Sequence, residues 1–274
     1  MVDRRSILIC GVGETASAVA LRLFLDGHAV ALCQVTGPNL LRRRMSFSDA
    51  WFDRYATLGG VAAQRTDSVS EFVDAMRMRD SIPLLRRSLS FAVEHWRFDA
   101  VVASRDDEET IDGPLNDFAR RSIGLGHGFS PGVDCDLVVE TDGPDPGALF
   151  YERLAARRSR AARMTSLDCE FDVVAPKTGE FRARVSVGLP IEAGQPIGVI
   201  GDAEVRAPIA GRLKGCVRTE QIVIAGEKIA ELALADRSPV SGVSETNKLI
   251  ARGVTFAIST GAQAPNAFPL EEIF

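Results

Sequence analysis

A glycine-containing loop near the start of the sequence has the spacing of a phosphate-binding turn. Gly11, Gly13 and Ala16 form the pattern G-x-G-x-x-A between a predicted buried strand over residues 6–10 and a predicted helix over residues 14–26. Small residues at these positions let the backbone approach a pyrophosphate and let the helix pack closely on the strand. The start of the helix adds free N–H groups and a positive dipole end, so the loop predicts nucleotide binding.

The acidic residue that normally completes a dinucleotide site is missing. The second predicted strand, over residues 28–33, is followed by Gln34, where an Asp or Glu would hold the ribose hydroxyls. Arg42, Arg43 and Arg44 come soon after it. They would suit a ligand with a 2′-phosphate, and they equally fit the solvated start of a helix. The sequence therefore leaves three alternatives open: a nucleotide, a dinucleotide, or a fold that binds neither.

A second glycine-rich loop follows a later predicted strand, within residues 122–132. Gly124, Gly126 and Gly128 would let this backbone come close to a ligand, although a plain tight connection has the same composition. His127 lies inside the loop, where its imidazole could pair with a phosphate or transfer a proton near neutral pH. It is the candidate catalytic residue, and the alternative is an ordinary exposed loop histidine.

Alternating strand and helix patterns connect the two loops. The predicted strands cover residues 59–64, 82–85 and 98–104, and the predicted helices cover residues 69–78 and 89–96. The carboxyl ends of parallel strands share one crevice, so both glycine loops are expected to border it. The fold class is therefore α/β, with a Rossmann-like nucleotide-binding domain over residues 1–150. Glu14, Arg42 and Arg43 are expected to join the two loops in binding a cofactor.

Composition and charge limit the classes of partner. The chain has 274 residues and a net charge of −5, which argues against a general nucleic-acid role. No apolar run approaches the roughly 18 residues of a membrane span, and the first residues lack the organisation of a signal peptide. The five cysteines form no CxxC pair, which indicates reduced thiols and no metal site. We therefore expect a cytoplasmic protein with no nucleic-acid or membrane partner.

Motif searches leave open whether the chain is an enzyme. The sequence contains no HExxH, no Walker loop and no defensible Ser-His-Asp order. His28 begins a predicted strand and His95 lies in a predicted helix, so both are interpreted as structural.

The second half of the chain repeats itself at a constant offset of 32 residues. The pattern A-P-x-x-G at 175–179 recurs at 207–211, and each copy reads as short β-runs with turn residues. These repeats resemble the biotinyl/lipoyl domain family, a flattened barrel made of two similar halves. The resemblance implies an all-β barrel-sandwich hybrid domain over residues 168–236. Its central hairpin, residues 199–208, contains no lysine, so we expect no biotin or lipoate attachment.

Two further segments flank this predicted barrel. Residues 151–167 form a basic linker, which is either a solvated surface or a docking site for an acidic partner. Residues 237–274 contain a predicted helix and a tail. The helix, over residues 246–258, places Leu249, Ile250, Val254 and Ile258 on one apolar stripe, so it is expected to return to the first domain.

Three ordered stretches together resemble one family. They are "CGVGETASAVALRL", "PNLLRRRMSFSDAWFD" and "GLGHGFSPGVDCDLVVET", and "SETNKLIARGVTFAI" near the end is similar to that family's final helix. The order is that of the YqeB-type accessory proteins of selenium-dependent molybdenum hydroxylases. The resemblance implies a Rossmann-like domain plus a barrel, and an accessory role in making or loading such an enzyme. The positions that match its motifs are Gly11, Gly13, Ala16, Arg42, Arg43, Phe47, Asp49, Gly124, Gly126, Gly128, Phe129 and Asp134.

The sequence also departs from the pattern of that family. Glu14 stands where the family usually has Asp, His127 stands where it has Pro, and no acidic residue lies near Gln34. The acidic stretch "SRDDEET" replaces lysines and an asparagine. Exchanging basic for acidic groups beside the crevice changes which anion is favoured. A divergent paralogue that serves another enzyme system, or assists the synthesis of another complex cofactor, fits these differences equally well.

Two function hypotheses therefore remain. In the first, the chain is an accessory protein that binds a nucleotide or nucleotide-bearing cofactor and docks on a client enzyme. In the second, it is a small NAD(P)-dependent oxidoreductase, an interpretation that rests on the first loop and is weakened by Gln34. The identity of the ligand, the client enzyme and the oligomeric state are left open by the sequence.

Overall fold

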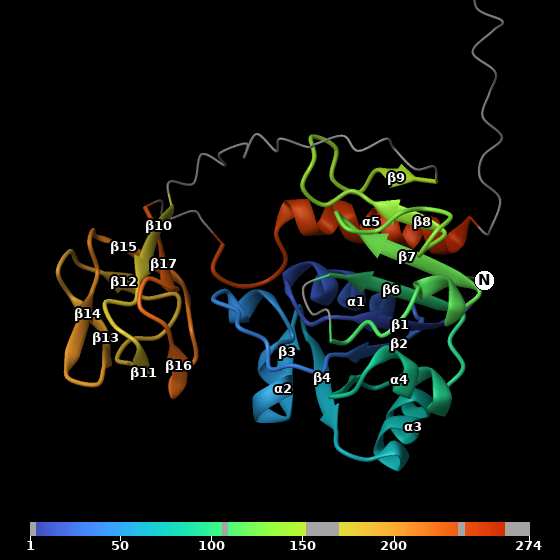
Figure 1. The fold of residues 1–274 in the computed structure, drawn as a ribbon, viewed down its shortest axis with the longest axis horizontal. Helices are drawn as coiled ribbons and strands as arrows, with labels where there is room; N and C mark the ends of the chain where they lie inside the picture. Colours follow the sequence, from blue (N-terminus) through green and yellow to red (C-terminus); the bar gives the residue numbers. More distant parts are fainter. Residues whose placement is uncertain (1–3, 106–108, 152–169, 235–238, 261–274) are drawn as a thin grey trace, which may run out of the picture.

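A nine-stranded sheet organises the first part of the chain in the computed structural model, which describes residues 4–105, 109–151, 170–234 and 239–260 (Figure 1). Its strand order is β3-β4-β5-β2-β1-β6-β7-β8-β9. The strands are β1 (Ser6–Cys10), β2 (Ala29–Cys33), β3 (Tyr55–Leu58), β4 (Val61–Thr66), β5 (Ile82–Leu85), β6 (Ala100–Ser104), β7 (Arg121–Leu125), β8 (Leu137–Val139) and β9 (Leu149–Phe150). Neighbours are parallel except for the antiparallel pairs β3–β4 and β8–β9 at the two edges. The fold is therefore mixed α/β, with a large sheet dominated by parallel pairs.

The central strands are apolar along their length because helices cover both faces of the sheet. On one face lie α1 (Glu14–Leu25) and α5 (Glu245–Ser259), and on the other lie α3 (Val69–Met78) and α4 (Leu89–His95). Side chains alternate between the faces along each strand. Ile7 and Ile9 of β1 thus join the core beneath α1 and α5, whereas Leu8 and Cys10 join the core beneath α3 and α4.

Helix α5 lies beside α1 although more than two hundred residues separate them in the sequence (Figure 1). Its buried stripe consists of Asn247, Ile250, Ala251, Val254, Ala257 and Ile258. Leu249, expected on this stripe, is 44% exposed, which corrects that prediction. Successive helical residues are about 100° apart around the axis, so Leu249 points away from the face that Ile250 buries.

A hairpin at one edge of the sheet was missed by the sequence pattern. The predicted strand over residues 59–64 begins at Val61, because Gly59 and Gly60 form the turn that joins β3 to β4, with φ of 57° and 82°. In β3 only Leu58 is fully buried. An exposed edge strand of this kind lacks the apolar run that marks the central strands.

The order of strands reverses at β1, which has β2 on one side and β6 on the other. In open parallel sheets, the crevice beyond the carboxyl ends at such a reversal is where ligands bind. Gly11 follows β1 directly and Ser104 ends β6. A Cβ atom on Gly11 would lie only 3.2 Å from Ser104 Oγ, so the two strand ends approach each other closely.

Residues 170–234, called here the two-sheet module, form two separate four-stranded antiparallel sheets. One has the order β10-β17-β15-β12 and the other has the order β14-β13-β11-β16. The strands are β10 (Glu170–Val174), β11 (Gly179–Ala183), β12 (Pro190–Ile191), β13 (Pro196–Ile200), β14 (Ala203–Arg206), β15 (Gly211–Cys216), β16 (Gln221–Val223) and β17 (Lys228–Ala233). Phe181, Leu213 and Ile229 lie in the apolar core that the two sheets share. The first sequence repeat supplies β11 to one sheet, and the second supplies the corresponding β15 to the other.

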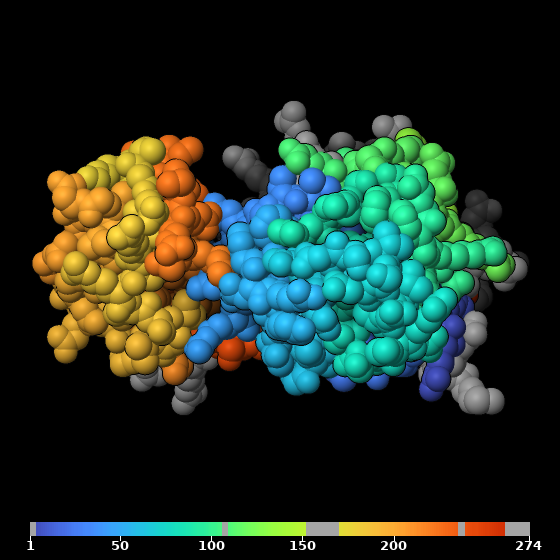
Figure 2. All heavy atoms as spheres, turned by 90° about the horizontal axis from the view of Figure 1, so that it is seen from below, coloured from blue at the N-terminus to red at the C-terminus, as the bar shows by residue number. Residues whose placement is uncertain are grey.

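The module contacts the segment that follows β2, which contains the short helices η1 (Arg43–Met45) and α2 (Asp49–Asp53). Cys216 N donates to Leu41 O at 2.9 Å, and the Arg218 guanidinium pairs with Asp49 at 2.8 Å and with Asp53 at 2.7 Å. Figure 2 shows the two lobes meeting at this junction. The contacts bring β15 and β17 of the module next to the ligand side of the large sheet.

Several predictions concern residues outside the described ranges. These include nearly all of the basic linker, residues 152–167, and the tail at residues 261–274. The four cysteines that the structure describes, Cys10, Cys33, Cys135 and Cys216, are buried free thiols. Within the described ranges, the helices are too short or too polar to cross a membrane.

Candidate functional site

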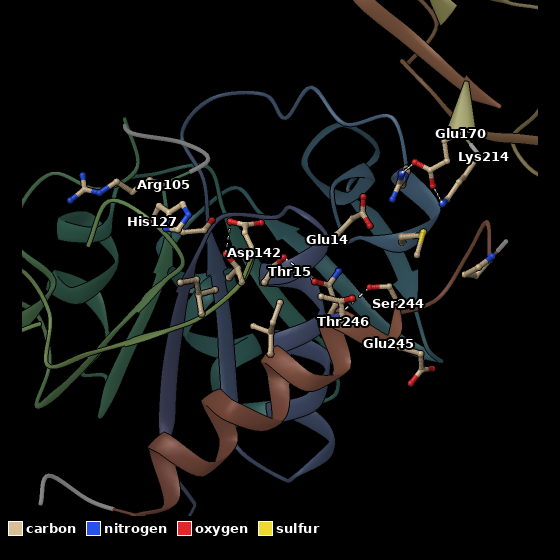
Figure 3. A pocket seen from close by; sticks show the side chains of 18 residues that line it. Glu14, Thr15, Arg105, His127, Asp142, Glu170, Lys214, Ser244, Glu245 and Thr246 are labelled. Atoms are coloured by element: carbon tan, nitrogen blue, oxygen red, sulfur yellow. Dashed lines mark hydrogen bonds and ion pairs between the residues drawn. The ribbon is translucent and has the colours of Figure 1, made fainter. Parts of the chain in front are cut away.

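A cavity of about 800 Å³ opens beyond the carboxyl ends of β1, β6 and β7 and reaches the two-sheet module. Its walls come from the first turn of α1, the segment after β2, the loops after β6 and β7, the module and the start of α5. Figure 3 shows Arg105 and His127 toward one end, Glu170 and Lys214 toward the other, and Glu14 between them. The cavity therefore lies at the reversal of strand order and gathers residues from distant parts of the sequence.

The first turn of α1 reaches this cavity without a side-chain cap. Gly13 is the N-cap residue and makes no side-chain hydrogen bond, so the first N–H groups of the helix lack the partner that Ser or Asp would give. Gly11 has a φ of 109°, a conformation that favours glycine. Glu14 and Thr15, the first two residues of α1, line the cavity, whereas Gly11, Gly13 and Ala16 are not among its lining residues.

Gln34 holds this loop in place from the end of β2. Its Oε1 accepts from Val12 N at 2.8 Å, and its Nε2 donates to Thr36 O at 2.9 Å. The residue is only 6% exposed. The oxygen and the nitrogen of the side-chain amide are thus both hydrogen-bonded within the protein. Gln34 therefore stabilises the loop and is not available to the ribose of a ligand.

Glu14 places a carboxyl group inside the cavity. No hydrogen bond or ion pair to this carboxylate is found among the residues that the structure describes. Burial raises the pKa of Glu14, while the nearby positive charges of Arg42 and Lys214 act in the opposite direction. A carboxyl group with a raised pKa can take up or release a proton close to a bound ligand.

Arg42 lines the cavity but is already paired with carboxylates of the module. Its Nε lies 3.1 Å from Glu231 Oε2, and its guanidinium lies 2.8 Å from Glu170 Oε2. Lys214 Nζ also pairs with Glu170, and its side chain is only 5% exposed. Although burial alone would raise the pKa of Glu231, the hydrogen bonds from Arg42 lower it to about 2. The cluster is therefore a charged contact between the sheet and the module, with its cations partly committed.

Arg43 points away from this cavity, contrary to its expected place beside Arg42. Its guanidinium pairs with Asp49 at 2.8 Å, and it lines a separate hollow of about 460 Å³ with Arg218. Adjacent residues in this turn thus face different sides of the segment. Phe47, in the same segment, is fully buried, and its N–H donates to Ser17 Oγ at 2.8 Å. Phe47 therefore supports the fold.

The glycines of the second loop are explained by packing. A Cβ on Gly124 would lie 2.7 Å from Phe129 Cδ2, and a Cβ on Gly128 would lie 2.7 Å from Arg105 Cδ. Gly126, with φ of 69°, packs against the Thr141 side chain. None of these three glycines is in the cavity wall, whereas the exposed His127 between them is. The structure therefore brings His127, Glu14 and Arg42 to one cavity.

Several lining residues were not predicted from the sequence. They are Thr15, Arg105, Asp142, Glu170 and Lys214, together with Ser244, Glu245, Thr246 and Asn247 at the start of α5. A Ser followed by polar residues before an apolar-periodic segment does signal a helix start. What the sequence lacked was any sign that this start would meet α1.

The arrangement offers anion binding and proton transfer more readily than metal chemistry. The described residues contain no group of three or more His, Cys, Asp or Glu side chains that could hold a metal ion. An uncapped helix start would attract an anion, and His127 offers a polar ring beside it. Arg42 and Lys214 add less positive charge because Glu170 and Glu231 pair with them, and Arg105 is paired with Asp134 at 3.2 Å. Glu14 and Asp142 restrict how much negative charge the cavity accepts.

Comparisons with known proteins give one related sequence of nearly full coverage. The chain is similar to the uncharacterized protein YqeB of Escherichia coli (strain K12), with 29% identity over 257 residues. The aligned region covers 92% of this chain and 47% of the relative, so the chain spans about half of that protein's length. No family model matches the chain.

Solved structures give only remote likenesses. An aspartoacylase family protein from Mesorhizobium loti covers 85% of the chain and 86% of its own, at 13% identity and a TM-score of 0.25. The ectoine utilization protein EutE from Ruegeria pomeroyi covers 77% of the chain and 60% of its own, at 10% identity and a TM-score of 0.23. Scores this low support no conclusion about fold or site.

Proposed function

We propose that the chain binds the phosphate-bearing part of a nucleotide, or of a nucleotide-bearing cofactor, in this cavity. The observation that carries the proposal is the start of α1, where Gly13 provides no side-chain cap and Glu14 and Thr15 line the wall. Free N–H groups and the positive end of a helix favour an anion. The position between β1 and β6 is the one at which open α/β sheets bind their ligands.

The finer fold assignment belongs to the same proposal. The order β5-β2-β1-β6-β7-β8, with parallel neighbours throughout, has the form of the 3-2-1-4-5-6 sheet of dinucleotide-binding proteins. We therefore assign residues 1–150 to a Rossmann-like domain. The internal repeat and the two small sheets support a barrel-sandwich hybrid over residues 168–236, although the structure shows two separate sheets rather than a closed barrel.

An accessory role is the function that agrees best with the module. The hairpin between β13 and β14 contains no lysine, so the module lacks the group that carries biotin or lipoate in related barrels. Instead, Glu170 and Lys214 bring the module into the cavity wall. On this proposal, the protein holds a nucleotide-bearing cofactor for a molybdenum hydroxylase or a related enzyme, the role that the YqeB-type resemblance implies.

The oxidoreductase alternative has less support. Gln34 occupies the position from which an acidic residue would hold the ribose of NAD. Its side-chain amide is hydrogen-bonded to the backbone of Val12 and Thr36. No other described residue of the cavity favours a nicotinamide over other nucleotide-bearing groups.

Binding is tested by calorimetry with NAD, NADP, ATP, CTP and pterin-type nucleotides. Gly13→Val should weaken binding by more than the roughly tenfold to hundredfold expected for one lost charge-assisted hydrogen bond, because its branched side chain blocks the approach to α1. Gly37→Val is the matched control: this exposed glycine lies outside the cavity wall, and its Cβ would meet Trp51 at an ordinary 3.4 Å. Absence of binding to wild type, or equal affinities for wild type and Gly13→Val, would contradict the proposal.

The accessory role needs a separate test. Deleting the gene should lower the activity of a molybdenum hydroxylase in the same cells, and wild type should restore the activity where Gly13→Val does not. Unchanged hydroxylase activity would remove the accessory role and leave the binding proposal intact.

A further inference from the structure

Helices α1 and α5 run side by side in the same direction. At their starts, Thr15 Oγ1 donates to Asn247 Oδ1 at 3.0 Å. Toward their other ends, Thr255 Oγ1 donates to Asp26 Oδ2 at 3.4 Å. Contacts at both ends fix the pair as parallel, so two positive helix ends meet at the wall of the cavity.

Like dipole ends placed together repel each other unless negative charge lies between them. At α1 the N-cap Gly13 gives no side-chain hydrogen bond. At α5 the N-cap Ser244 accepts from Asn247 N at 3.2 Å, which leaves the first-turn N–H groups of Glu245 and Thr246 without that cap. Several backbone donors from two helices therefore converge on one part of the cavity.

Asn247 supplies a second, independent indication of a ligand. It is only 8% exposed, and it lines the cavity. Its Oδ1 accepts from Thr15, whereas no acceptor for its Nδ2 is found among the described residues. A buried amide donor without a partner is unfavourable in a folded protein. An acceptor on a bound ligand would satisfy it.

We propose that one phosphate group of the ligand lies between the N-termini of α1 and α5 and accepts a hydrogen bond from Asn247 Nδ2. This inference rests on the proposed nucleotide binding and adds the position and the partners of the phosphate. It assigns α5, which the nucleotide-type loop does not include, to the binding site. The chemical class is a phosphoryl group, whether it belongs to a nucleotide or is free phosphate or pyrophosphate.

The surrounding charges favour a phosphate of low net charge. Glu14 lies at the start of α1, where burial raises the pKa of its carboxyl group. Glu245 at the start of α5 is paired with Lys248 at 2.6 Å. The other charged groups facing this region are Arg42, Arg105, Lys214, His127, Asp142, Glu170 and Glu231. A phosphodiester within a dinucleotide-type cofactor matches this balance better than a terminal triphosphate.

The test combines calorimetry with backbone-amide NMR on the full chain, using inorganic phosphate, pyrophosphate, AMP and NAD as probes. The variant Asn247→Asp keeps the acceptor for Thr15 and replaces the amide donor by a carboxylate oxygen. It should weaken binding of the phosphate-bearing probes by roughly tenfold to hundredfold. Asn116→Asp is the control, because it makes the same change in charge on an exposed residue outside the cavity wall. Binding to wild type should shift the amide signals of both 14–16 and 245–247.

Each outcome decides one of the two proposals. Nucleotide binding that is lost in Gly13→Val but unchanged in Asn247→Asp overturns this inference and leaves the proposed function standing. Signal shifts confined to residues 14–16 do the same, and they decide the question even if Asn247→Asp fails to fold. Absence of binding by all four probes overturns this inference, and if ATP, CTP and pterin-type nucleotides also fail to bind, both proposals are overturned. If free phosphate and pyrophosphate bind as tightly as AMP and NAD, the phosphate position stands and the nucleotide assignment is lost.

Discussion

The two glycine loops have similar sequences, but the structure gives them different tasks. In the loop after β1, Gly13 begins a helix whose first turn is open to the cavity. In the loop after β7, Gly124 and Gly128 are small because Phe129 and Arg105 occupy the space that a side chain would need. Glycine content alone therefore does not mark a ligand site. The distinguishing feature is whether backbone donors face an open volume or a packed neighbour.

The largest expected effect is on stability, in the second loop. Gly124→Val should lower the free energy of unfolding by about 3 kcal/mol, because its side chain would overlap the buried Phe129. Chemical denaturation of the purified variant measures this loss. Gly37→Val, in an exposed loop, is the control. A loss below about 1 kcal/mol would show that the second loop has room for a ligand-facing role after all.

Arg42→Ala should have the next largest effect, near the first loop. The change leaves Glu231, whose side chain is 3% exposed, with Lys228 at 3.4 Å as its nearest remaining cation, so we expect a loss of about 2 kcal/mol. The pKa of Glu231, lowered from 4.5 to about 2, means that its contribution is complete above 4.5 and is lost as the pH falls toward 2. Denaturation of wild type and variant should therefore converge between those pH values. A difference independent of pH in this window would refute the assigned pairing.

Glu14→Gln should produce a smaller change of the opposite sign. The folded protein binds a proton on Glu14 more tightly than the unfolded chain, since burial raises its pKa above 4.5. Its favourable contribution is therefore present below 4.5 and disappears as the pH rises through the raised value. The Gln variant should be more stable than wild type at neutral pH and should lose this advantage in acid. Equal stability at neutral pH would place the Glu14 carboxyl in water instead of in the cavity.

The fold could be predicted from the sequence more completely than the candidate site. The central strands could be predicted from apolar runs such as residues 82–85, because parallel strands that are buried on both faces contain few polar residues. The exposed edge strand β3 carries no such signal. The start of α1 was predicted from small residues that follow a strand. The start of α5 was predicted to within one residue, but its place beside Thr15 was not, because that depends on contacts across 232 residues of sequence. The sequence pattern also did not predict the direction of each side chain: Arg42 lines the cavity, whereas the adjacent Arg43 lines a different hollow.

His127→Ala should have the smallest effect. The residue is exposed, and its neighbours Gly126 and Gly128 already have the backbone conformation that the loop requires. The free energy of unfolding should change by less than about 0.5 kcal/mol. Calorimetry with a nucleotide should show a modest loss of affinity, because one polar contact to the ligand is removed. An affinity equal to that of wild type would remove His127 from the site.

The most direct test of the central claim is native mass spectrometry of the purified protein, with and without added nucleotides. We expect wild type to carry a non-covalent mass that contains phosphate, released on denaturation and also seen on His127→Ala. The same mass should be absent from Gly13→Val protein that is shown to be folded by circular dichroism. Wild type without any bound mass, even with nucleotides in excess, or Gly13→Val carrying the same mass, would contradict the assignment of the α1 start as the phosphate site.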